Sequence, residues 1–111
     1  MKKADQIRIN QEVEAAISQM QEDIKKEDIL KVRRLRSCSA EVAESEHYYI
    51  LRSYNTIVAF IDKRSDTLYD ALRLVYGYTA TSAQHISKFD QDYSRDPYEW
   101  HCSRSLRYYP V

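Results

Sequence analysis

The stretch YYILRSYNTIVAFID, residues 48–62, decides the fold because it places two strand-forming runs on either side of a turn. Tyr48 to Leu51 are strand formers. Tyr54-Asn55 marks a tight turn. Thr56 to Ile61 is a run of β-branched and aromatic residues that is long enough for a buried strand. The stretch therefore predicts the centre of a small sheet.

The segment that follows fits two patterns. Residues 62–66 form a polar turn without an apolar side chain. In residues 67–76, leucines and Val75 spaced by three and four fit a helix, whereas alternate apolar positions fit one face of a strand and only Asp70 breaks that alternation. Because a polar loop between two apolar runs favours a hairpin, we predict a strand over 67–76.

A second helix is predicted over residues 80–92. Thr81 is a good N-cap, and Gln84 stands three residues later, which is the capping-box pattern. The Asp-Pro pair at 96–97 ends this helix or follows its end. We expect residues 104–109 to add a last edge strand.

The N-terminal part of the chain predicts a long amphipathic helix over residues 4–26, uninterrupted by glycine or proline. Its apolar face either packs on its own domain or pairs with a second copy or with a partner helix. Residues 27–45 are ambiguous, because they could extend the helix or begin a strand. The predicted seam of a homodimer is formed by Ile9, Val13, Ile17, Met20 and Ile24.

These patterns predict an α+β fold with a small antiparallel sheet of three or four strands. The 80–92 helix covers one face, and the N-terminal helix packs on the sheet or projects from it. The expected organisation is an N-terminal helix over residues 1–30 followed by a small α+β domain over residues 31–111.

Composition excludes several classes of function. The 111 residues carry 17 basic and 17 acidic side chains, and this balance argues against a dedicated nucleic-acid binder. The single glycine, Gly77, excludes Gly-rich phosphate loops. No run approaches the roughly 18 apolar residues of a membrane span, so we expect no membrane partner. The sequence shows no secretory signal region, and we interpret Cys38 and Cys102 as reduced thiols. The expected location is therefore the cytoplasm.

Residues that carry catalytic chemistry are sparse. His85 could act as a general base, but no acid or nucleophile is predicted beside it. Asp62, Asp66 and Asp70 are spaced by four, so they would share a face of a helix but would not meet on a hairpin. The histidines and cysteines match no zinc spacing. We therefore expect no enzyme activity, no metal and no cofactor.

Tyrosine is the informative excess, with 10 in the chain. A tyrosine buries a large ring and keeps a hydroxyl at the surface, which suits a protein interface, and arginine is its usual companion there. The alternative is that the sheet simply uses tyrosine as a strand former. The predicted protein-binding residues are Tyr48, Tyr54, Tyr76, Tyr78, Arg104 and Arg107.

A basic run offers an alternative function. Its side chains, together with nearby tyrosines, could bind phosphates and stack on single-stranded bases. The neutral net charge makes this small nucleic-acid-binding module the second hypothesis. The third is a homodimeric structural accessory protein. The residues predicted for nucleic acid are Lys31, Arg33, Arg34 and Arg36.

Three segments carry a resemblance to a known group: SYNTIVAFID at 53–62, LYD at 68–70 and YGYTATSAQHISKF at 76–89. They resemble small uncharacterised proteins carried by phages and conjugative elements of bacteria, over about residues 46–93. In that group a strand pair ending in an aromatic-Thr-Thr/Ser stretch leads into a helix with a histidine and a phenylalanine. The group has no known activity, so it assigns no catalytic role to Thr79, Thr81 or His85.

The resemblance implies a setting in a bacterial host cell. Short accessory proteins of mobile elements often counter host defence, and some similar-looking ones are anti-CRISPR inhibitors that bind stoichiometrically. It therefore implies a non-enzymatic inhibitor whose partner is a host defence protein, such as an RNA-guided CRISPR nuclease. This inference rests on association, because function does not follow from fold.

Overall fold

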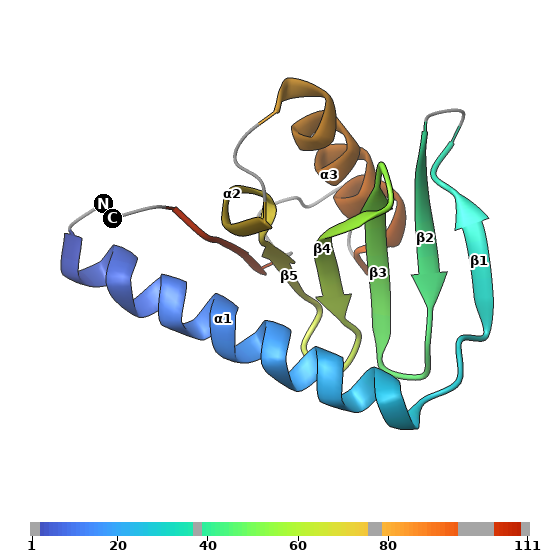
Figure 1. The fold of residues 1–111 in the computed structure, drawn as a ribbon, viewed down its shortest axis with the longest axis horizontal. Helices are drawn as coiled ribbons and strands as arrows, with labels where there is room; N and C mark the ends of the chain where they lie inside the picture. Colours follow the sequence, from blue (N-terminus) through green and yellow to red (C-terminus); the bar gives the residue numbers. More distant parts are fainter. Residues whose placement is uncertain (1–2, 37–38, 76–78, 96–103, 110–111) are drawn as a thin grey trace.

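The fold is α+β, with a six-stranded mixed sheet between helices (Figure 1). The computed structural model of the protein describes residues 3–36, 39–75, 79–95 and 104–109. The elements in chain order are α1 Lys3–Lys26, β1 Lys31–Arg34, β2 Ala40–Glu44, β3 Tyr48–Ser53, β4 Thr56–Asp62, β5 Thr67–Asp70, α2 Leu72–Val75, α3 Ala80–Tyr93 and β6 Arg104–Arg107.

The strands lie in the sheet in the order of the chain, β1 to β6. The first five form an antiparallel meander, whereas β6 runs parallel to β5. The sheet thus has more strands than expected, and it is not purely antiparallel. The ambiguous segment 27–45 supplies the two additional strands β1 and β2. The parallel pair follows from the path of the chain, which returns to the edge of β5 after passing through α2 and α3.

The strand expected over 67–76 is shorter than predicted. Strand β5 ends at Asp70, and residues 72–75 turn into the short helix α2. The reason is local: the Asp70 carboxylate accepts a hydrogen bond from the Leu72 main-chain N–H at 3.1 Å. This bond satisfies a donor at the start of α2, which a strand would have used for pairing. The acidic residue that broke the alternation therefore marks the end of the strand.

Helix α3 begins where expected, but its N-cap is Thr79 instead of Thr81. The Thr79 side chain accepts a hydrogen bond from the Ser82 main-chain N–H at 3.2 Å. Thr79 itself has an extended backbone, as an N-cap residue requires. Thr81 lies inside the first turn, so the predicted capping box with Gln84 is not the one used.

The sheet buries apolar side chains on both faces. Strand alternation sends Leu51 and Ile61 to the face that is covered by α3, where they pack with Phe89. It sends Ile50 and Phe60 to the face that α1 crosses. Figure 1 shows α1 and α3 on opposite sides of the sheet. Two separate cores therefore hold the three layers together.

The apolar stripe of α1 packs on its own sheet. Val13 and Met20 are at most 1% exposed. Ile17 and Ile24 are partly buried and pack against the core between α1 and the sheet. Ile9 is half-buried. The five side chains predicted as a dimer seam are thus covered wholly or in part by their own chain, and the dimer stays a prediction. The physical reason for this packing is that a sheet face needs a cover as much as a helix stripe does.

Candidate binding surface around the edge strand β1

Strand β1 is an outer strand of the sheet, and all four of its residues are exposed. It is fixed on its inner side by β2 and at its end by Leu35, which is buried and donates its main-chain N–H to Ala40 O at 2.8 Å. Because side chains alternate along a strand, Lys31 and Arg33 lie on the α3 face and Val32 lies on the α1 face. The two faces beside β1 differ in chemistry.

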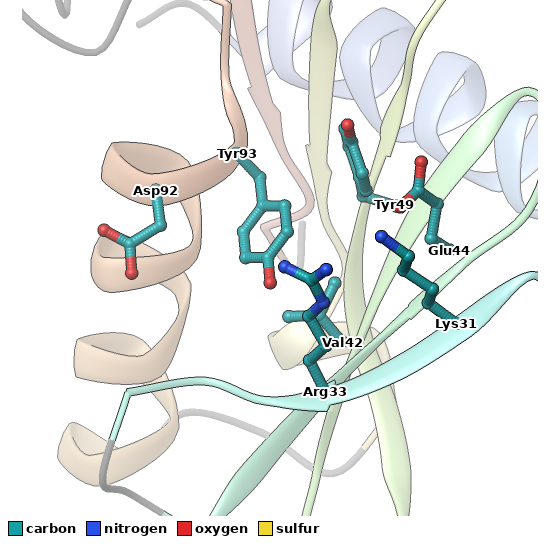
Figure 2. A pocket seen from close by; sticks show the side chains of 7 residues that line it. All are labelled: Lys31, Arg33, Val42, Glu44, Tyr49, Asp92 and Tyr93. Atoms are coloured by element: carbon teal, nitrogen blue, oxygen red, sulfur yellow. The ribbon is translucent and has the colours of Figure 1, made fainter.

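A cationic pocket lies beside β1 on the α3 face, with a volume of about 200 Å³ (Figure 2). Its aromatic part is formed by Tyr49 of β3 and Tyr93 of α3, whose ring centroids are 4.9 Å apart. Figure 2 shows the Arg33 guanidinium beside Tyr93 and the Lys31 side chain reaching from β1 toward Tyr49. The lining residues are Lys31, Arg33, Val42, Glu44, Tyr49, Asp92 and Tyr93.

The two acidic side chains of this pocket already have cationic partners. Glu44 binds the Lys63 ammonium at 2.6 Å, and Asp92 binds the Arg36 guanidinium at 2.8 Å. Within the described part of the chain, Lys31 and Arg33 form no ion pair. The pocket therefore offers two unneutralised cations to a ligand.

The Tyr93 hydroxyl adds a hydrogen-bond donor to the cationic pocket. Burial raises the pKa of Tyr93 above its usual value of about 10, although the nearby Arg33 charge opposes the shift. The hydroxyl is therefore protonated at neutral pH and can donate. A donor beside two cations suits a carboxylate or another small anion.

An apolar groove of about 230 Å³ lies on the other face of the same edge. Its exposed side chains are Ile29, Val32 and Ile57, which are 47%, 57% and 39% exposed. The charged pair at its rim, Glu41 and Arg52, is neutralised internally at 2.6 Å. Helix α1 crosses nearest to β5 and β6 and reaches this groove only with Ile24. The remaining lining residues are Ala43 and Ile50.

Of the residues predicted to bind protein, Tyr48, Tyr54 and Arg107 are described by the structure, and these three lie in different places. Tyr48 is buried, and its hydroxyl donates to Asp23 at 2.5 Å and accepts from Arg64 at 2.9 Å, so it ties α1 to the sheet. This corrects its assignment to an interface. Tyr54 is exposed at the β3–β4 turn, with a φ of 50°. Arg107 lies on β6, at the opposite edge from β1, and pairs with Asp70 at 3.4 Å. Tyr76, Tyr78 and the Arg104 side chain lie outside the described residues.

The basic run is split between different environments. Lys31 and Arg33 share the cationic pocket, whereas Arg34 lies on the opposite face. The Arg36 guanidinium binds both Asp92 and Gln91 of α3. A nucleic-acid backbone along one face could therefore not contact all four cations. Sequence reasoning named the two pocket cations but missed Tyr49 and Tyr93, which only the packing of α3 brings together.

A second polar group lies in the interior between β3 and α3. The Ser53 hydroxyl shares hydrogen bonds with His85 Nδ1 at 3.0 Å and with the Ser82 hydroxyl at 3.1 Å. A serine beside a histidine is the arrangement of an activated nucleophile. Here, however, the Ser53 and Ser82 side chains are fully buried and His85 is 3% exposed, so a substrate has no access to them. Their hydrogen bonds join α3 to the sheet.

The three aspartates spaced by four do not converge. Asp62 binds Arg64, Asp66 binds Arg95 and Asp70 binds Arg107. Among the described residues, no group of three or more histidine, cysteine, aspartate or glutamate side chains could hold a metal ion. In the same residues no helix is both long and apolar enough to cross a bilayer.

The buried histidine makes stability depend on pH. Burial lowers the pKa of His85, and the Lys88 charge lowers it further. As the pH falls below about 6.5, the unfolded chain gains a proton on this side chain that the folded protein excludes. We therefore expect the free energy of unfolding to decrease between about pH 7.5 and pH 5, as measured by urea unfolding. In His85→Gln this dependence should shrink, and an unchanged slope would contradict the assignment.

Comparisons with known proteins return no match: no family model, no curated protein and no solved structure resembles the chain significantly.

Proposed function

We propose that the protein acts by binding another protein, and that the sheet edge around β1 is its docking surface. One observation carries the proposal: the exposed strand β1 lies between a cationic pocket with two unpaired cations and an apolar groove. Exposed apolar area rimmed by charge is typical of protein interfaces. Ile29, Val32 and Ile57 supply that area.

We further propose that the partner is a host defence protein and that binding inhibits it. Support for this setting comes from the resemblance of residues 46–93 to small proteins of phages and conjugative elements. An inhibitor that acts by occupying a surface needs no active site. The inaccessible Ser53–His85 pair is compatible with that mode of action.

The test is a titration of the purified protein into RNA-guided nucleases of several types, with cleavage of target DNA as the readout. We expect cleavage by one of them to fall to background near a 1:1 ratio. The double variant Ile29→Asp/Val32→Asp should lose inhibition by more than tenfold in concentration, because it places charge in the apolar groove. Ile7→Asp is the matched control, since Ile7 is 39% exposed on α1 and lies outside the groove.

Two results would overturn this proposal. Cleavage that is unaffected by a large molar excess, across every nuclease type, would remove the inhibitor function. The second result is inhibition by a protein that also shifts the mobility of DNA in the absence of the nuclease, with a DNA affinity that falls steeply with salt. This result would assign the effect to nucleic-acid binding instead.

A further inference from the structure

The free edge of β1 has main-chain groups available for pairing. Leu35 donates to Ala40, and antiparallel ladders alternate, so the main-chain groups of Arg33 and Lys31 point toward β2. Those of Val32 and Arg34 point away from the sheet. Such an edge is a template for another strand.

At the opposite edge of the sheet, helix α1 contacts β6 and the chain just beyond it. The Asn10 side chain of α1 binds the main chain of Tyr109 through both of its polar atoms, just beyond β6. Figure 1 shows the N-terminal part of α1 beside β6, whereas β1 lies on the far side of the sheet. Within the described residues, β1 is the edge strand that α1 leaves without such a contact, and all four of its residues are exposed.

We propose that the partner adds an extended segment to β1 as a seventh strand, and that this segment alternates acidic and apolar side chains. This inference rests on the proposed docking surface and specifies how it is used. The alternation follows from the pleat: side chains directly opposite each other on paired strands lie on the same face. Residues of the segment opposite Lys31 and Arg33 meet unpaired cations, so they are acidic. The residue opposite Val32 extends the apolar groove.

Charge excludes a second copy of this chain as the occupant. A two-fold symmetric antiparallel pair of β1 strands would place Lys31 of one copy opposite Arg33 of the other, or the two Arg33 side chains opposite each other, depending on the register. Like charges directly opposite each other destabilise a strand pair. A basic edge strand is also a common device against self-association. An acidic segment turns the same charges into an attraction.

The probe is a fluorescently labelled peptide of about eight alternating glutamate and valine residues, the length of an ordinary strand, with binding measured by fluorescence anisotropy. A second peptide has the same composition with its glutamates and valines in two blocks. We expect the alternating peptide to bind at least tenfold more tightly. Lys31→Glu/Arg33→Glu should weaken its binding at least tenfold. The matched control Lys3→Glu/Arg8→Glu reverses two exposed charges on α1 and should leave binding unchanged.

Main-chain pairing is tested with N-methylated peptides, because a methyl group removes the N–H donor. In an antiparallel addition the valine amides of the peptide face β1, so methylating them abolishes binding and methylating the glutamate amides does not. A parallel addition reverses the two results. Amide exchange in the protein should slow at Val32 and Arg34 on binding. If both methylated peptides bind equally and these amides stay unprotected, strand addition is wrong.

The outcomes separate this inference from the proposed function. In one outcome, Ile29→Asp/Val32→Asp loses nuclease inhibition, but the alternating and blocked peptides bind equally or not at all. This result supports the docking surface and overturns the addition of a seventh strand. In the other outcome, the alternating peptide binds more tightly than the blocked one, but the protein inhibits no nuclease. This result supports strand addition and overturns the proposed inhibitor function.

Discussion

Val13→Glu is expected to unfold the protein. Val13 has no exposed surface in α1, and its side chain belongs to the stripe that packs on the sheet. A glutamate there would place an unpaired carboxylate in an apolar environment, which costs about 4 kcal/mol or more. That is a large fraction of the roughly 5–15 kcal/mol by which folded domains are stable. The measurement is thermal unfolding followed by circular dichroism.

The same substitution separates the two interpretations of the α1 stripe. Ala15→Glu is the matched control, because Ala15 is exposed on the same helix and should tolerate the charge. If α1 instead formed the seam of a dimer, Val13→Glu would give a folded monomer of half the native mass by analytical ultracentrifugation. A folded Val13→Glu variant with a lower mass would therefore restore the dimer.

Phe89→Ala should have the second largest effect, about 3–5 kcal/mol of lost stability. The Phe89 side chain has no exposed surface and belongs to the core between α3 and the sheet. Its removal leaves a cavity that the strands cannot fill without moving. The melting temperature should fall by about 10 °C or more, whereas Ser87→Ala at an exposed position of α3 should leave it nearly unchanged.

The Phe89 variant also bears on the cationic pocket. Its ring centroid lies 5.6 Å from that of Tyr93, which in turn packs on Tyr49. Loss of Phe89 should therefore loosen the aromatic part of the pocket and weaken binding at β1, even at a temperature where the variant is folded. A stability loss below about 1 kcal/mol would mean that α3 is not seated on the sheet as described.

The parts of the fold that the sequence predicted are those with strong local patterns. The run Thr56–Ile61 and the turn at Tyr54-Asn55 lie where expected, and so do the long α1 and α3. Strand β1 had no such pattern, because KVRR has one apolar residue and forms a strand only by pairing with β2. The parallel pairing of Thr67 with Arg104 joins distant segments, which no local periodicity can indicate.

The candidate site was predictable only in part, for a related reason. Lys31 and Arg33 stood out as basic residues, but their separation from Arg34 depends on the pleat of a strand that the sequence did not reveal. Tyr48 and Tyr49 are chemically alike and adjacent. Alternation sends the first under α1 and the second into the cationic pocket. Tyrosine content alone could not distinguish a core residue from a binding residue.

The hydrogen bonds between Asn10 and Tyr109 have a consequence for synthesis of the chain. These residues are 99 positions apart, so the first helix cannot complete its contacts until the last strand has left the ribosome. The hairpins from β1 to β5 involve neighbouring segments and can form earlier, because local contacts close quickly. In that interval the apolar stripe of α1 has only part of its cover. Nascent chains of this protein should therefore reach protease resistance only after residue 109 has emerged from the ribosome.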